Sequence, residues 1–346
     1  MRLKLIGFIV VTIAILSCNG GVNTSSEPID LQPLNLSVSR LDQELFKADK
    51  YQLKALNKKW ISSYGLLYNS FISEMLREGL PQDPMIVYRL EKFLNDTTIN
   101  LISKELDESF LDFSPYKKEL EEGFAHYKHY FPGRIIPKIV TFYSNFNART
   151  FPYNDTLAIG LDLFIGRDNK VTEMLPPDVF PQYIKEDMDK EYLSSESMKS
   201  WLYFSLSPTG EYANSGVYAT KEDFLSSMIY HGKMMLALDL MMPNTAIQTK
   251  FNYSKEEIAW CQKNEKFLYQ NLIEFKLIYS RNIKEIAAYI NPGSFTPGLP
   301  QDSPGGIGKW IGYRMVKQYY EENNLDLSEL IEQKGDAKKI LSFYRP

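Results

Sequence analysis

The chain has 346 residues and a net charge of −4 at pH 7, from 39 lysine and arginine residues against 43 aspartate and glutamate residues. Neither sign of charge is gathered into long blocks, which excludes the basic stripe expected of a protein that binds nucleic acid. With 44% hydrophobic and 14% aromatic residues, the composition is that of a globular protein rather than a disordered one.

The N-terminus has the order of a secretory signal. Arg2 and Lys4 give a cationic start, residues 5–16 form an apolar run, and Ser17 precedes Cys18. The run is too short to cross a bilayer, which takes about 20 residues. This stretch resembles the lipobox of bacterial lipoproteins, which implies cleavage before Cys18 and fatty acylation of its thiol and new amino group. The alternative is an ordinary signal peptide with an incidental cysteine.

The residues after Cys18 indicate where the protein is delivered. Asn19 takes the place of the aspartate that retains lipoproteins in the inner membrane, so bacterial sorting rules imply the outer membrane. No acidic residue follows directly, which favours the periplasmic leaflet over the cell surface. We expect residues 1–17 to be a signal peptide, residues 18–33 a lipidated flexible tether, and residues 34–346 a single globular domain.

Most of this domain shows the apolar spacing of amphipathic helices, including residues 41–56 and 61–76. Ser114 and Pro115 predict the start of another helix, with the serine as its cap, ending at Pro132. The capping-box pattern at residues 254–257 predicts a further helix toward Phe275. The chain has one other cysteine, Cys261, so lipidation of Cys18 leaves no intramolecular disulfide and stability must come from the core.

Two segments have the composition of strands. Residues 137–146 and 156–164 are rich in β-branched and aromatic residues and are separated by a loop rich in asparagine, proline and aspartate. We therefore expect an α+β fold, dominated by helices, with a small antiparallel or mixed sheet and a long buried helix.

His126 and His129 are the first candidate metal ligands. They stand three residues apart on a predicted helix, close to one face, and would seat a metal if a third ligand came from elsewhere. Packing or hydrogen bonding beside Tyr127 and Phe131 is the favoured interpretation.

His231 lies in a strongly apolar segment that we expect to form a buried helix starting at Thr220 with Asp223. A zinc peptidase helix needs two histidines four residues apart, with a glutamate after the first to activate water. Here Gly232 follows His231 and Met235 stands four residues along, so the base and the second ligand are both missing. We expect a core helix in which Gly232 allows a close neighbour.

A loop rich in proline and glycine, residues 291–308, runs into a helix that we expect to end near Glu322. Glycines at the start of a helix can bind phosphate, and Lys309 adds charge. No serine or threonine follows Lys309 and no strong strand precedes the glycines, so nucleotide is not expected and a tight loop is favoured. Asp162 stands alone among apolar residues, and we expect it to cap a turn rather than act as a catalytic acid.

Together these features resemble the GldB family of gliding motility-associated lipoproteins of the Bacteroidetes. The resemblance runs from about residue 33 to the C-terminus and rests on four motifs in order: a histidine-containing segment before Tyr130-Phe131-Pro132; residues 159–166 with Pro181 and Tyr183; residues 230–233 with Pro243; and residues 305–313.

The resemblance implies a role in surface gliding, linked to type IX secretion, with envelope proteins as partners and the membrane reached through the lipid. The chain is also similar to predicted zincin-like metallopeptidases, so if His231 matches their first histidine, the chain resembles a pseudo-peptidase scaffold without catalytic residues, metal or cofactor. His231, Gly232, Lys233 and Asp162 remain candidate pocket residues. Two alternatives stay open: a metal-dependent peptidase or amidase with an unrecognised site, and a glycan-binding lipoprotein.

Overall fold

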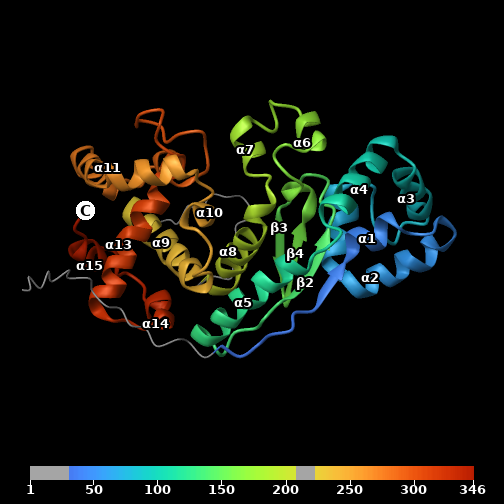
Figure 1. The fold of residues 1–346 in the computed structure, drawn as a ribbon, viewed down its shortest axis with the longest axis horizontal. Helices are drawn as coiled ribbons and strands as arrows, with labels where there is room; N and C mark the ends of the chain where they lie inside the picture. The colour runs from blue at the N-terminus through green and yellow to red at the C-terminus, as the bar shows by residue number, and fades with distance from the viewer. Residues whose placement is uncertain (1–30, 208–222) are drawn as a thin grey trace, which may run out of the picture. The chain divides into compact units, whose positions relative to one another are not determined.

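The structure, a computed structural model, describes residues 31–207 and 223–346. Helices surround a four-stranded sheet of spatial order β1-β2-β4-β3 (Figure 1). The strands are β1 (Val38–Arg40), β2 (Lys138–Phe142), β3 (Thr150–Tyr153) and β4 (Thr156–Gly160). β2 pairs in parallel with β1 and with β4, whereas β3 pairs antiparallel with β4. The prediction of a helix-dominated α+β fold with a small mixed sheet is confirmed.

The helices fall into two runs. The run before and around the sheet comprises α1 (Leu41–Phe46), η1 (Lys50–Gln52), α2 (Leu53–Ser70), η2 (Phe71–Met75), α3 (Ile86–Leu94), α4 (Thr97–Ser109), α5 (Ser114–Tyr130), η3 (Leu161–Phe164), α6 (Lys170–Met174), α7 (Gln182–Glu186), η4 (Lys190–Tyr192) and α8 (Leu193–Leu206). The second run comprises α9 (Phe224–Met241), α10 (Ile247–Phe251), α11 (Lys255–Glu274), η5 (Leu277–Tyr279), α12 (Ile283–Ile290), α13 (Ile307–Asn323), α14 (Leu327–Glu332) and α15 (Ala337–Phe343).

Gln32–Pro346 form one compact unit by their contacts. Within it, α5 and α8 lie along one side of the sheet and α1–α4 along the other (Figure 1). Every residue of β4 is buried; the strand lies between β2 and β3, and α8 packs against β3 and β4. None of the helices in the described parts of the chain is long and apolar enough to span a membrane.

The expected helices over residues 41–56 and 61–76 are wrong in their bounds. The chain turns after Phe46, where the Asp49 carboxylate accepts a hydrogen bond from the Tyr51 amide at 3.0 Å and caps η1. Gly65, at φ +46°, then interrupts the helical geometry of α2, and η2 follows Ser70. Apolar spacing alone does not reveal such breaks, because buried apolar residues continue on both sides of each one.

The expected strands were also too long. Residues 137–146 form a strand only to Phe142, and residues 156–164 only to Gly160, where η3 begins. β1 and β3 were not predicted, since three or four residues give too little pattern to recognise.

Two of the helix N-caps expected from the sequence are present in the structure, and one is not. The capping box at α11 is complete: the Glu257 amide donates to Ser254 Oγ at 3.1 Å, and the Ser254 amide donates to Glu257 Oε2 at 2.7 Å. Asp223 caps α9 by accepting from the Ser226 amide at 3.0 Å, whereas Thr220 lies outside the described residues. Ser114 was wrongly expected to be a cap, because Asp112 accepts a hydrogen bond from its amide at 2.8 Å and makes it the first helical residue.

α9 and α13 cross so closely that only glycine fits at the crossing. A Cβ atom on Gly232 would overlap the backbone carbonyl group of Gly312, and one on Gly312 would overlap the carbonyl oxygen of Met228. α9 is buried along most of its length at the centre of the helical half of the molecule. This contact therefore fixes the position of α13 relative to α9.

We expect Gly232→Ala and Gly312→Ala each to lower the free energy of unfolding by about 2–4 kcal/mol, because the helices must separate to accept the methyl group. Urea denaturation measures the loss. Gly133→Ala is the control, since a Cβ there meets no atom within 4 Å, and it should be nearly neutral. Equal effects at all three positions would contradict the close crossing.

Candidate functional site

His231 lies inside the protein, on α9, with 1% of its surface exposed. Its Nδ1 is 2.7 Å from the hydroxyl oxygen of Tyr203 on α8, and the rings of Tyr203 and Tyr230 pack against the imidazole. Burial, with a smaller effect from Lys309, lowers the pKa of His231 well below its usual value. The imidazole is therefore neutral at physiological pH.

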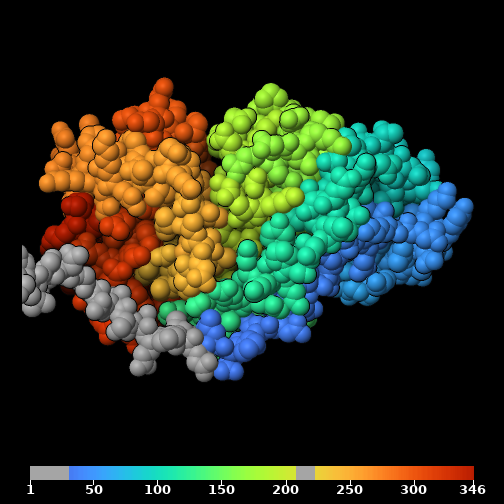
Figure 2. Space-filling model, in the orientation of Figure 1, coloured from blue at the N-terminus to red at the C-terminus, as the bar shows by residue number. Residues whose placement is uncertain are grey.

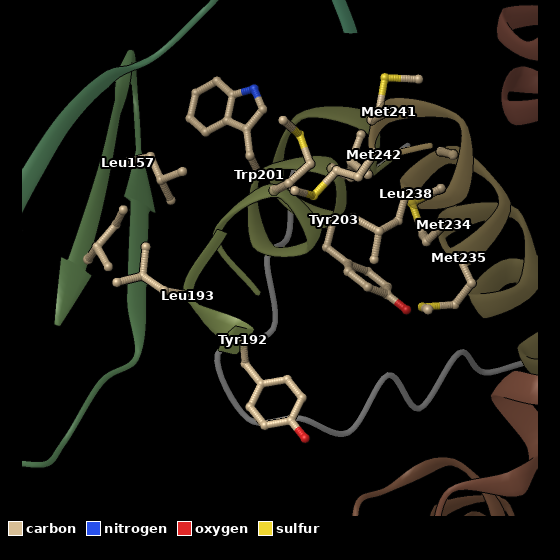
Figure 3. Packing of buried hydrophobic residues seen from close by; sticks show 14 of the residues in the cluster. Leu157, Tyr192, Leu193, Trp201, Tyr203, Met234, Met235, Leu238, Met241 and Met242 are labelled. Atoms are coloured by element: carbon tan, nitrogen blue, oxygen red, sulfur yellow. The ribbon is translucent and has the colours of Figure 1, made fainter. Parts of the chain in front are cut away.

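The positions that would carry a zinc peptidase's base and second ligand serve helix packing here. Gly232 faces the backbone of α13, where even a methyl group does not fit. Met235 is 2% exposed, and Figure 3 shows Met234 and Met235 near Tyr203 of α8. Within residues 31–207 and 223–346, no three histidine, cysteine, aspartate or glutamate side chains converge as potential metal ligands.

His126 and His129 lie in different environments on α5. His126 is 8% exposed and burial lowers its pKa, whereas His129 is exposed and its ring stands edge-on to Tyr130. Glu122 lies close enough to His126 to oppose this shift, but among the residues that the structure describes no three side chains of these kinds are placed to hold a metal ion. The packing interpretation fits this geometry.

Lys233 connects α9 to the C-terminal helices. Its ammonium nitrogen lies 2.8 Å from Asp336 Oδ2 and donates to the Gln333 carbonyl at 2.9 Å. Both partners lie between α14 and α15, so the side chain joins two parts of the core.

Asp162 is fully buried at the start of η3. Its carboxylate accepts hydrogen bonds from the Ser144 amide and hydroxyl, both at 2.8 Å, and from the Phe146 amide at 2.6 Å. Burial raises its pKa to about 6, although these hydrogen bonds act in the opposite direction. Asp162 thus closes the loop after β2, as a turn-capping residue does. Cys18, the expected lipid attachment site, lies outside the described residues.

A cluster of charged side chains lies near His231, and sequence reasoning missed it. We call it the Lys309 site and define it by Arg149, Asp187, Glu196, Lys199 and Lys309. Arg149 Nη1 lies 3.9 Å from Asp187 Oδ2, and Lys199 Nζ lies 2.6 Å from Glu196 Oε1. The five residues come from four distant segments, so no local spacing marks them; only the glycines before Lys309 drew attention to this region.

Lys309 lies in the first turn of α13. The preceding glycines hold it there, because a Cβ atom on Gly305 would overlap the Gly293 backbone and one on Gly308 would lie 2.9 Å from the Tyr289 carbonyl oxygen. Burial, reinforced by Lys199, lowers the pKa of Lys309 to about 8, while Glu196 and Asp187 act in the opposite direction. Its ammonium has no hydrogen-bond or ion-pair partner among the described residues.

We predict that the stability advantage of the natural protein over Asp162→Asn shrinks as the pH rises from about 4 to about 7. The folded-state pKa of about 6 lies above the usual 3.8, so folding takes up a proton in this range and stability falls as the carboxyl ionises. Urea denaturation across this range provides the test. Asp178→Asn is the control: Asp178 is exposed, and the difference in unfolding free energy between this variant and the natural protein should not change with pH. A difference that is independent of pH for Asp162→Asn as well would contradict the burial of Asp162.

Comparison with known proteins gives one match. The sequence model of the family described as gliding motility protein GldB matches residues 23–346. No curated protein and no solved structure matches the chain significantly. Since the match spans nearly the whole chain, including α9 and the Lys309 site, the chain belongs to the GldB family of gliding motility lipoproteins.

Proposed function

We propose that this protein is a non-catalytic lipoprotein of the outer membrane that supports gliding, and its associated secretion and motor apparatus, through contacts with other envelope proteins. The observation that supports it most is the α9–α13 crossing. At the position after His231, a hydrolase needs a carboxylate, and here the backbone of Gly312 occupies that space.

Lipid attachment suits a role based on contacts. Several acyl chains on Cys18 would hold the protein stably at the periplasmic leaflet, since one chain binds only marginally. Confinement to one surface raises the effective concentration of the protein near its partners, so that modest interfaces suffice. The tether of residues 18–33 would span at most about 3.5 Å per residue, which keeps the folded domain near the membrane.

Removal of the lipid site tests the anchoring. In a strain deleted for the gene, Cys18→Ala should leave the protein folded but absent from the outer-membrane fraction, and single-cell gliding should be weak or lost. Cys261→Ala, which changes the other cysteine, should keep both the location and the movement. Normal gliding with unlipidated protein would overturn this part of the proposal.

A second complementation tests the absence of catalysis. We expect His231→Ala, present at normal level, to restore gliding in the deletion strain, because His231 serves packing and its bond to Tyr203. Immunoblotting controls for the level. Failure of a stable, normally abundant His231→Ala protein would show that this region has a chemical role.

A further inference from the structure

A group of exposed apolar side chains lies where the end of α11 leads through η5 into α12. Its members are Ile273, Phe275, Tyr279 and Ile283, which are each between 48% and 64% exposed. We call this group the apolar corner. Figure 2 shows the orange surface that includes α11 facing outward, and no other described segment covers it in this view.

Local hydrogen bonds fold the backbone of the apolar corner tightly. The Lys276 amide donates to the Ile273 carbonyl at 3.0 Å, and the Ser280 amide donates to the Leu277 carbonyl at 2.8 Å. The Ser280 carbonyl in turn accepts a hydrogen bond of 2.8 Å from the Phe224 amide at the start of α9. Because the chain turns repeatedly here and is tied to α9, the four apolar side chains lie close together at a fixed place on the surface.

Basic residues are interleaved with these apolar side chains. Lys276, Arg281 and Lys284 are all exposed, and none of the ion pairs in the described parts of the chain involves them. From Lys266 to Lys284 the sequence has four basic residues and one acidic residue, Glu274, although the net charge of the whole chain is −4. The apolar corner is therefore a basic region on an acidic protein.

Lys276 occupies an unusual backbone position. It directly follows the last turn of α11 and has φ +56°, in the left-handed region where a helix end most often has glycine or asparagine. The corner thus has a cation, directly after the exposed Phe275, at a position that the backbone alone would favour for a small residue.

The combination of apolar and basic side chains indicates which partner covers the corner. Exposed apolar groups of this kind mark a contact with a protein or with a membrane. Lysine is depleted in protein interfaces, whereas aromatic side chains among lysines and arginines are typical of surfaces that lie in the headgroup region of a bilayer. There the apolar groups leave water while the cations reach the phosphates of anionic lipids.

We propose that the apolar corner binds an anionic phospholipid surface, with its apolar side chains among the headgroups and with Lys276, Arg281 and Lys284 against the phosphates. This inference rests on the lipid attachment proposed above and is independent of the role in gliding. The anchor at Cys18 would hold the protein at the membrane, and the apolar corner would determine which side of the folded domain faces the lipid.

Quenching of a fluorescent dye by the membrane tests this orientation. A bimane dye is attached at Ile283→Cys in the full-length lipoprotein, bound to vesicles of phosphatidylethanolamine and phosphatidylglycerol that contain a nitroxide-labelled lipid. Cys261 is buried, so the dye reacts at the new thiol. The control dye is attached at Leu111→Cys, an exposed apolar position beside Asp112. Quenching at residue 283 should be at least threefold stronger than at residue 111.

Equal quenching at the two positions, or no quenching at residue 283, would overturn the proposal. Flotation of the same vesicles separates this inference from the lipid attachment on which it rests. Flotation of the protein without quenching at residue 283 would overturn the apolar corner alone, whereas loss of flotation would contradict the attachment as well.

Charge reversal tests the basic part of the corner. Lys276→Glu together with Arg281→Glu should reduce quenching at residue 283 at least fivefold, and so should vesicles without phosphatidylglycerol. Lys54→Glu together with Lys92→Glu changes the net charge equally at exposed lysines elsewhere and should leave the quenching unchanged. Equal effects of the two double variants would show that only the total charge matters and would contradict the proposal.

Removal of the apolar part separates lipid binding from folding. Phe275→Ser together with Tyr279→Ser should reduce quenching at residue 283 at least fivefold and leave the melting temperature unchanged, because both side chains are exposed. A lower melting temperature with unchanged quenching would show that they serve folding and would contradict the proposal. A dye at residue 283 that is shielded from iodide in native outer membranes, but not quenched in lipid vesicles, would identify a protein partner instead and would overturn it.

Discussion

The close crossing of α9 and α13 at Gly232 and Gly312 is the constraint on which the rest of the helical half depends. Two helix backbones in direct contact leave no space for side chains at the crossing, so both positions require glycine. Around that contact, α9 places His231 against Tyr203 of α8 and joins Lys233 to the C-terminal segment. One turn before the crossing, α13 carries Lys309. The packing around His231 and the position of Lys309 therefore both depend on the contact between α9 and α13.

The same constraint bears on function. A residue directly after His231 is in the right place to activate water only if its side chain points into an open site. In this chain that direction is filled by α13, and Met235 lies in the apolar core. His231 itself is held by packing and by its hydrogen bond to Tyr203, which fits a role in contacts better than one in hydrolysis. The lipid expected at Cys18 would hold such contacts at the membrane surface.

Part of this organisation was visible in the sequence. Three features were predictable because they depend on residues close together in the sequence: the capping box at Ser254, the long buried helix that carries His231, and the small residue at Gly232. The two breaks between residues 41 and 76 come from the Asp49 cap and from Gly65, which apolar spacing does not reveal, whereas β1 depends on pairing with β2, far along the chain. The Lys309 site is the clearest case: its charges lie between residues 149 and 309, and only folding brings them together. Even so, Lys309 stood out beside its glycines, although as a possible phosphate ligand.

The metal content of the protein, purified from its own envelope without chelators, tests the central claim most directly. If α9 serves packing, elemental analysis should find zinc and other transition metals far below one atom per chain, in the natural protein and in His231→Ala alike. About one equivalent of zinc in the natural protein, lost in a folded His231→Ala variant, would show that α9 still carries a metal site and would contradict the account.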